Sequence, residues 1–375
     1  MKKICLKAPA KINLGLSILS KLSSGYHEVK FIFQQVSLFD RIYLQEIKKN
    51  EIRVYCDNQD VPLNQVNTVY QAALLIKKTM KIKTGIAIKI EKNIPVGGGL
   101  AGGSSDAAQT LIGLNRLWNI GLNTKDLIKF GLKIGMDVAY QLVGGSQLAT
   151  HQGEKLKTLP PLPKMNLVLS NPNINVSTQW AYANVDYSQV GQEQLESLIS
   201  AIKTGRVEKI AQNLHNDFEF WVPNFYPAIL KIKRKMLEAG ALGALMSGSG
   251  PTVFCVCENH SSAVKIAHLL KKDYPPNLFG EEFNLDFLPS LWSNLLPLLE
   301  EPPKVIVGIF IRTHYKIRAG DKSFRRCGLI SGISKITVQR KSIGGKDALT
   351  SQDRGARAGL NRFSHKHPLS FTHRT

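Results

Sequence analysis

Five glycines between residues 97 and 103 mark the stretch whose residue types and spacing most directly suggest chemistry. Glycine has no Cβ, so its backbone can adopt positive φ and bring successive N–H groups close to a ligand. Ser104 and Ser105 follow and suit a helix N-cap, and apolar residues then recur at helical spacing from Ala107 to Trp118. Unpaired N–H groups and the positive end of a helix dipole favour phosphate at such a position. The stretch therefore predicts a phosphate-binding loop, with a nucleotide as the candidate ligand.

Neither common glycine-rich nucleotide motif fits this loop. The Gly-x4-Gly-Lys-[Ser/Thr] loop requires a lysine that does not follow these glycines. Residues 97–102 match the spacing Gly-x-Gly-x-x-Gly, but a lone match is weak support for a dinucleotide site. A flexible glycine-rich loop without a ligand is the alternative interpretation at this point.

The composition is that of a soluble globular protein. The chain has 375 residues, 43% of them hydrophobic and 21% charged, which suggests about two to three domains. Its five cysteines form no Cys-x-x-Cys pair and are too few for a disulfide scaffold, which indicates a reducing compartment. We find neither a signal peptide nor an apolar stretch that could cross a bilayer. We therefore expect a cytoplasmic protein without a membrane partner.

The net charge of +21 raises the possibility of nucleic-acid binding, so its distribution along the chain matters. Residues 304–375 hold 16 of the 49 basic and 3 of the 28 acidic residues, a contribution of +13. The rest of the chain carries +8, which suits an enzyme that handles phosphorylated anions. The aromatic residues of the basic tail form no regular pattern that would give bases a stacking platform. We expect no nucleic-acid partner, and a basic RNA-binding protein is the alternative from another functional class.

Alternating residues over 11–18 predict a half-buried strand. Side chains two residues apart project in the same direction, so Lys11 and Asn13 can face a polar site together. Three prolines at 160–163 interrupt regular structure and mark a boundary between two lobes. The other predicted elements are strands over 29–38, 41–47, 85–91 and 165–170 and helices over 68–79, 124–134, 192–204, 227–239 and 261–272.

A second glycine-rich turn, Ser247-Gly248-Ser249-Gly250, separates two apolar runs in the second lobe. It is either a structural turn or the place where small residues let this lobe approach a ligand held by the first. Beyond about residue 287 the chain is broken by prolines and is then basic and rich in serine and glycine, which is typical of disorder. We predict an N-terminal lobe at 1–159, a C-terminal lobe at 164–287 and a disordered basic tail at 288–375.

Three separated patches together resemble the GHMP kinase superfamily: Ala8 to Leu14, Pro95 to Ala108, and Met246 to Pro251. The pairing of the first patch with Gly25-Tyr26-His27-Glu28 resembles the branch that acts on a cytidine diphosphate-linked methylerythritol in non-mevalonate isoprenoid synthesis. The resemblance covers roughly residues 3–287 and implies a two-lobed α+β fold, with ATP and Mg²⁺ as cofactors. It also implies transfer of the γ-phosphoryl group to the 2-hydroxyl of that substrate. A homoserine-type or mevalonate-type kinase and an inactive kinase are the alternatives.

The resemblance also implies roles for individual residues. Asp137 would be the general base that accepts the hydroxyl proton, and Lys11 beside it would stabilise charge and keep the carboxylate ionised. Asn13 would contact the substrate, Tyr26 would stack on the cytosine and His27 would hydrogen-bond to it. The implied ATP-binding residues are Pro95, Val96, Gly97, Gly98, Gly99, Leu100, Ala101, Gly102, Gly103, Ser104 and Ser105, of which the two serines would bind phosphate or orient Mg²⁺.

The chain departs from the family pattern in several places, including the flanks of the predicted base, residues 151–152, Ser24 and the tail. Met136, Ala139 and Tyr140 flank the predicted base where a small residue and then Asp-Val-Pro-Phe are usual. Residues 288–375 have no counterpart in the family, whose chain normally closes with a strand soon after the helix predicted at 261–272. Loss of that strand would leave an open sheet edge.

Overall fold

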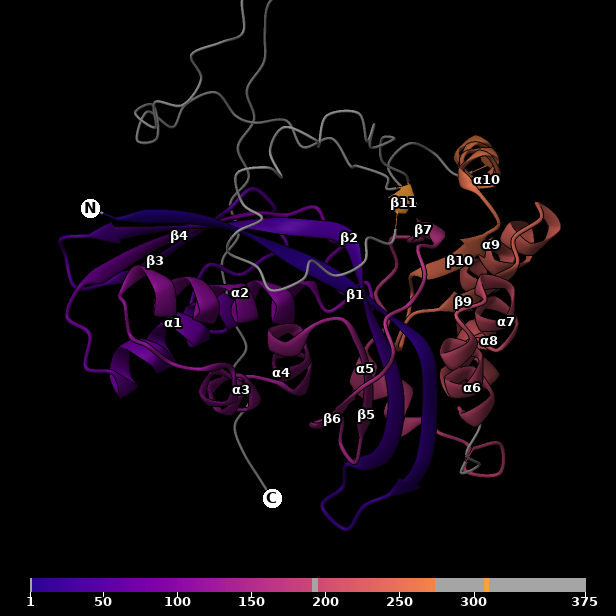
Figure 1. Ribbon diagram of the computed structural model, residues 1–375, viewed down its shortest axis with the longest axis horizontal. Coiled ribbons are helices and arrows are strands. Elements are labelled where there is room, and N and C mark those ends of the chain that lie inside the picture. The colour runs from indigo at the N-terminus through magenta and orange to yellow at the C-terminus, as the bar shows by residue number, and fades with distance from the viewer. Residues whose placement is uncertain (1, 191–194, 274–306, 310–375) are drawn as a thin grey trace, which may run out of the picture. The chain divides into compact units, whose positions relative to one another are not determined.

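Two long antiparallel strands, β1 (Lys3–Lys21) and β2 (His27–Ile47), form the centre of the larger of two sheets. They run side by side across Figure 1. The structure is a computed structural model that describes residues 2–190, 195–273 and 307–309. The described residues belong to one compact unit. Because β1 is long enough to pair with nearly all of β2, the two strands predicted within β2 are one continuous element.

The strand predicted over 11–18 is buried on both faces, so the expectation of a half-buried strand is wrong. The apolar face packs into the core as expected, with Ile12 and Leu14 fully buried. The other face is covered by the second lobe: a Cβ added at Gly15 would lie 2.8 Å from the side chain of Leu195. The face that carries Lys11 and Asn13 is therefore enclosed and not a solvated surface.

The larger sheet positions the helices that carry the phosphate loop. Its strand order is β3-β4-β2-β1-β8, with β5 and β6 extending from β2. One hydrophobic cluster joins the sheet residues Ile42 and Leu44 to Leu111 and Leu114 of helix α2. The bounds are β3 (Ile52–Cys56), α1 (Thr68–Thr79), β4 (Gly85–Glu91), α2 (Gly102–Leu117), α3 (Thr124–Leu132), α4 (Met136–Val143), β5 (Ser146–Thr150), β6 (Lys155–Thr158) and β8 (His215–Asn216).

The smaller sheet has the order β11-β7-β10-β9, in which β11 is Val307–Ile309, and carries the second glycine-rich turn between β9 and β10. Cys255 and Cys257 are fully buried in β10 as free thiols. Leu245 and Phe254 belong to the same cluster as Ile12 of β1, so the two sheets share a core. The bounds are β7 (Asn166–Ser170), α5 (Thr178–Ala183), α6 (Glu196–Thr204), α7 (Val207–Gln212), η1 (Asp217–Phe220), α8 (Val222–Phe225), α9 (Pro227–Glu238), β9 (Gly243–Met246), β10 (Val253–Cys257) and α10 (His260–Asp273).

The two-lobed α+β fold is confirmed, and most predicted elements differ from the observed ones by only a few residues at their ends. Helix α1 and strand β4 have the predicted bounds. The helix predicted over 192–204 corresponds to α6, and its first predicted residues, 192–194, lie outside the described residues. The sequence analysis missed several short elements with little periodicity of their own, among them β3, α4, β5, β6, α5, α7 and α8. No helix in the described ranges is both long and apolar enough to cross a bilayer.

Residues 307–309 form a short strand, β11 (Val307–Ile309), inside the segment predicted to lack regular structure. Strand β11 pairs in parallel with β7, so the edge that we expected to be open is paired along these residues. The other residues of the predicted tail, 288–306 and 310–375, lie outside the described part of the chain.

Candidate active site

The Lys11 side chain lies at the centre of the polar site and is only 5% exposed. Its Nζ donates to Asn13 Oδ1 at 2.6 Å, as expected for two residues on the same strand face. The same Nζ donates to the carbonyl oxygen of Gly99 at 3.3 Å, so the lysine contacts the backbone of the glycine loop. Burial lowers the pKa of Lys11, while the negative charge of Asp137 opposes that shift. The structure thus brings a buried amine, an amide and the glycine loop together.

The glycine loop needs the conformational freedom of its residues at Gly97 and Gly99, where φ is +67° and +72°. Helix α2 begins at Gly102, and its N-cap is Ala101 in the left-handed region, with φ 54° and no side-chain cap. The expectation that Ser104 and Ser105 cap the helix is therefore wrong, because both serines lie inside its first turns. Without a capping side chain, the first N–H groups of α2 can donate to an anion.

The second glycine-rich turn packs directly on the first loop. Ser247 Oγ donates to the Gly99 carbonyl at 3.1 Å and accepts a hydrogen bond from the backbone N–H of Asn13 at 3.3 Å. A Cβ added at Gly248, where φ is +60°, would lie 3.5 Å from Asn13 Oδ1 and 3.7 Å from Lys11 Nζ. These contacts favour the interpretation in which small residues let the second lobe approach the site. Ser249 Oγ, by contrast, hydrogen-bonds to Thr178 Oγ1, and Gly250 precedes a cis proline.

Asn216 holds this second turn in place and was missed as a site residue by the sequence analysis. Its Nδ2 donates to the carbonyl oxygens of Met246 at 2.7 Å and Gly248 at 2.8 Å. The side chain is 3% exposed, so both bonds are shielded from water. The neighbouring Asp217 accepts a hydrogen bond from the backbone of Ile18 in β1. No motif named in the sequence analysis includes Asn216, and its role depends on contacts with residues about 30 positions away.

Asp137 lies in the first turn of α4, a helix that the sequence analysis did not predict, and is half-buried. Its charge acts on the pKa of Lys11 and of the buried Tyr140, whose pKa is raised mainly by burial and further by Asp137. The tyrosine is accommodated without disturbing the helix: its hydroxyl donates to the Gly145 carbonyl at 2.8 Å and its ring packs 4.7 Å from that of Phe33. Phe33 in turn lies 5.1 Å beneath Lys11 Nζ. Tyr140, one of the residues at which the chain departs from the family pattern, therefore has a hydrogen-bonding partner within the fold.

An aromatic group forms a second part of the site. The His27 ring stacks on Tyr182 at 4.7 Å between ring centroids and faces Tyr187 at 6.1 Å. Burial raises the pKa of Tyr182, and the charge of Asp137 raises it further, so Tyr182 connects His27 to the region of Asp137. Tyr26 lies in the turn before β2 and is 63% exposed. The sequence analysis missed Tyr182, because a tyrosine in a short helix with no motif around it gives no signal.

The residues of the site lie on both lobes and converge from strand β1, the glycine loop, helix α4 and the turn after β9. The part of the chain that the structure describes contains no group of three or more His, Cys, Asp or Glu side chains that could hold a metal ion. A glycine loop at a helix N-terminus, a buried lysine and a nearby carboxylate are the groups that phosphoryl transfer uses for positioning and charge stabilisation. The fold and the site together define a small-molecule kinase.

Comparison with known proteins agrees with this class. The GHMP kinases N terminal domain matches residues 67–145, and the GHMP kinases C terminal domain matches residues 198–276. A relative from Bacillus cereus named 4-diphosphocytidyl-2-C-methyl-D-erythritol kinase is 41% identical over 288 residues, which cover 76% of this chain and 100% of the relative. A relative of the same name from Enterococcus faecalis is 44% identical over 269 residues, covering 72% of this chain and 95% of the relative.

A solved structure of 4-(cytidine 5'-diphospho)-2C-methyl-D-erythritol kinase matches the fold with a TM-score of 0.62 and 31% identity. The match covers 72% of this chain and 96% of that protein. The chain therefore belongs to the 4-diphosphocytidyl-2-C-methyl-D-erythritol kinase family within the GHMP kinases.

Proposed function

We propose that the chain transfers the γ-phosphoryl group of ATP to the 2-hydroxyl of 4-diphosphocytidyl-2-C-methyl-D-erythritol. The observation that carries this proposal is the buried Lys11 amine, which contacts the glycine loop through Gly99 and lies within the electrostatic field of Asp137. Relatives 41% and 44% identical to the chain bear the name of this kinase. The site supports the transfer chemistry, and the relatives support the identity of the acceptor.

The chemistry follows from the placement of the charged groups. The carboxylate of Asp137 accepts the proton of the substrate hydroxyl while the hydroxyl oxygen bonds to the γ-phosphorus. The bond between that phosphorus and the β–γ bridging oxygen breaks, and ADP leaves with the electron pair. The protonated Lys11 stabilises the negative charge on the transferring group, which a buried amine does more strongly than an exposed one. The N–H groups at residues 97–103 hold the phosphates of ATP in line for the transfer.

Aromatic residues give the acceptor its recognition. A cytosine ring offers a flat face for stacking and a hydrogen-bonding edge, which the Tyr182 ring and the His27 imidazole match in type. Asn13, already hydrogen-bonded to Lys11, contacts the substrate near the reacting hydroxyl. Tyr26, in the turn before β2, is 63% exposed and offers a further ring that can stack on the base. The homoserine and mevalonate types of kinase act on acceptors without a base, so they need no such aromatic group.

Mg²⁺ fits this site as an ion that accompanies ATP. Kinases commonly hold Mg²⁺ through one or two protein oxygens together with the nucleotide phosphates. Ser105 Oγ is buried in the first turns of α2 and has no hydrogen-bond partner among the described residues, so it would provide one ligand. When bound, the ion would neutralise charge on the β- and γ-phosphates. A cytoplasmic location and the lack of a nucleic-acid partner stay predictions from composition alone.

The test of the proposed function is ATP turnover measured separately with the cytidyl substrate, homoserine and mevalonate. We expect phosphorylation of the cytidyl substrate only. Turnover with homoserine or mevalonate, and none with the cytidyl substrate, would show that the proposed acceptor is wrong. A salt-sensitive RNA affinity together with the absence of any turnover would instead favour the nucleic-acid interpretation.

Replacing Tyr182 by Ala should raise KM for the cytidyl substrate by about tenfold or more and leave KM for ATP unchanged. Loss of base–aromatic stacking costs about 1–3 kcal/mol, which is the physical basis of this expectation. Tyr182→Phe serves as the matched control, since it keeps the ring and should keep the affinity. An unchanged KM for the cytidyl substrate in Tyr182→Ala would remove Tyr182 from the recognition group.

The pH dependence of turnover should reflect the lowered pKa of the buried Lys11. Burial lowers the pKa of this lysine from its ordinary value of 10.5, so its charged form disappears earlier as the pH rises. Turnover in wild type should therefore fall on the alkaline side before pH 10.5. Lys11→Arg keeps its charge over this range, so its residual turnover should lack this alkaline fall. A profile that stays flat in wild type up to that pH would show that the charge of Lys11 is not required.

A further inference from the structure

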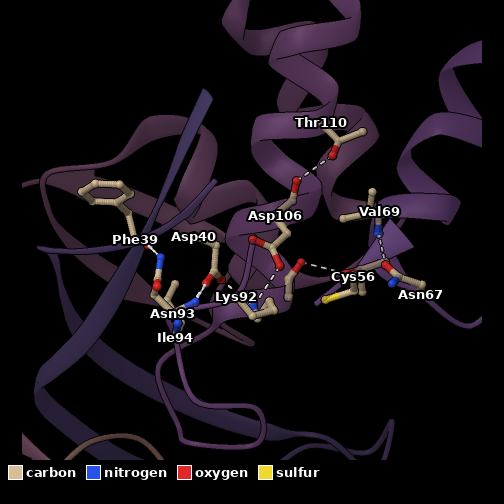
Figure 2. A network of polar contacts seen from close by, with 12 residues as sticks. Phe39, Asp40, Cys56, Asn67, Val69, Lys92, Asn93, Ile94, Asp106 and Thr110 are labelled. Atoms are coloured by element: carbon tan, nitrogen blue, oxygen red, sulfur yellow. Dashed lines mark hydrogen bonds and ion pairs between the residues drawn. The ribbon is translucent and has the colours of Figure 1, made fainter. Parts of the chain in front are cut away.

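A buried ionic network of Lys92, Asp40 and Asp106 lies beside the glycine loop (Figure 2). The Nζ of Lys92 pairs with Asp40 Oδ2 and, at 2.9 Å, with Asp106 Oδ2. The three side chains are 4%, 0% and 3% exposed. None of these residues has a role in the phosphoryl transfer described above.

The network holds both ends of the glycine loop. Asp40 Oδ1, on strand β2, accepts hydrogen bonds from the backbone N–H groups of Asn93 and Ile94 at 2.5 and 2.8 Å, immediately before the loop begins. Asp106 lies in helix α2, immediately after the loop ends. Lys92 bridges the two carboxylates, so the chain entering the loop and the helix leaving it are attached at one point. Figure 2 shows these side chains pointing toward one another from different elements.

The Lys92 ammonium also lies close to the backbone where α2 begins. A Cβ added at Gly102, the first residue of α2, would be 3.1 Å from Lys92 Nζ and 3.0 Å from a side-chain carbon of Ile94. The Lys92 ammonium group therefore packs against the first turn of α2, where the N–H groups of the helix have no intrahelical partner.

We propose that Lys92 is a positioning residue for ATP, which acts with Asp40 and Asp106 as an ionic clamp that fixes the span of the glycine loop. This inference rests on the proposed function, because it takes ATP as the ligand of the loop. A loop held at both ends presents its N–H groups already in place, so that less conformational entropy is lost when the phosphates bind. The clamp therefore acts on nucleotide affinity and not on the proton transfer at Asp137.

The electrostatics of the clamp make Lys92 its essential member. Burial alone would lower the pKa of Lys92, but the charges of Asp106 and Asp40 outweigh burial and raise it, so the lysine stays charged. Burial is the main cause that raises the pKa of Asp106; the charge of Lys92 opposes the shift, and the nearby Asp40 adds to it. Without Lys92, two buried carboxyl groups would face each other with no cation between them. The expected response is separation of the loop from β2.

The test compares Lys92→Met with Lys77→Met, because Lys77 is the matched control. Lys77 is also a buried lysine of the first lobe, 9% exposed, and its Nζ donates to Asn50 Oδ1 and to the carbonyl oxygens of Ile82 and Thr84, away from the glycine loop. Dissociation constants for ATP are measured by calorimetry on the full chain, alongside Tm and the KM for the cytidyl substrate. We expect ATP to bind about tenfold more weakly to Lys92→Met and with wild-type affinity to Lys77→Met. Both variants should have a lower Tm.

A second variant keeps the proposal open to test if Lys92→Met does not fold. Asp106→Asn keeps the shape of the side chain and an oxygen toward Lys92 but replaces the ionisable carboxyl group by a neutral amide, and we expect ATP to bind about threefold more weakly. Its KM for the cytidyl substrate should stay at the wild-type value. An ATP affinity within error of wild type in the folded variants would overturn the clamp, as would an equal loss in Lys77→Met. If wild type itself binds no ATP, the proposed function fails first and the clamp falls with it.

Discussion

Asp137→Asn is expected to reduce kcat by about 10²–10⁴-fold while the enzyme still binds ATP and the cytidyl substrate. The substitution keeps the size of the side chain but removes the group that accepts the proton of the substrate hydroxyl. It also removes the negative charge that opposes the lowered pKa of Lys11, so the amine should lose its proton at lower pH. Steady-state kinetics at saturating ATP, with binding measured separately by calorimetry, would check this result.

Lys11→Met should reduce kcat by a similar factor, because the charge that stabilises the transferring group is gone.

Asp126→Asn is the matched control for Asp137→Asn. Asp126 is a carboxylate near the start of helix α3 that pairs on the surface with Lys129. We expect this control to keep wild-type kcat. Equal rates in wild type, Asp137→Asn and Lys11→Met would exclude the proposed mechanism.

Gly99→Ala should reduce kcat/KM by about 10²-fold or more, because it separates the glycine loop from the second lobe. A Cβ at Gly99 would lie 2.2 Å from the carbonyl oxygen of Ser247 and 2.9 Å from that of Gly250, both of them backbone atoms. The residue also has φ +72°, which an alanine adopts only with strain. The loop or the turn must move, and the contact of Lys11 with the Gly99 carbonyl is lost with it.

Gly121→Ala is the control for the strain of a positive φ without a clash. Gly121 has φ +82°, and a Cβ there would meet no atom within 4 Å. We expect this variant to lose about 1–2 kcal/mol of stability and to keep its kinetics. If Gly99→Ala and Gly121→Ala behaved alike in kcat/KM, contact between the two glycine-rich segments would not be needed for catalysis.

Local patterns were enough to predict the elements with strong periodicity. The alternation over 11–18 placed Lys11 and Asn13 on one strand face, and their 2.6 Å hydrogen bond confirms it. The apolar spacing from Ala107 onward predicted the buried face of α2. Each of these signals lies within a few residues along the chain, which is the range over which side-chain periodicity operates.

The features that were missed depend on contacts between distant segments. Burial of both faces of β1 arises from packing of the second lobe, as the contact of Gly15 with Leu195 shows. The cap of α2 was placed at the wrong residues because left-handed Ala101 replaces the side-chain cap that serines usually provide. Asp40 and Asp106 are 66 positions apart, so no local pattern could join them through Lys92.

The Gly99 carbonyl links the two lobes at the glycine loop. This one oxygen accepts hydrogen bonds from Lys11 of the first lobe and from Ser247 of the second. A displacement of the second lobe therefore reaches the amine through two successive hydrogen bonds that share an atom. The position of the Lys11 amine and the distance between the lobes are thus coupled through the Gly99 carbonyl. The contact between the two lobes therefore helps to set the position of the Lys11 charge in the site.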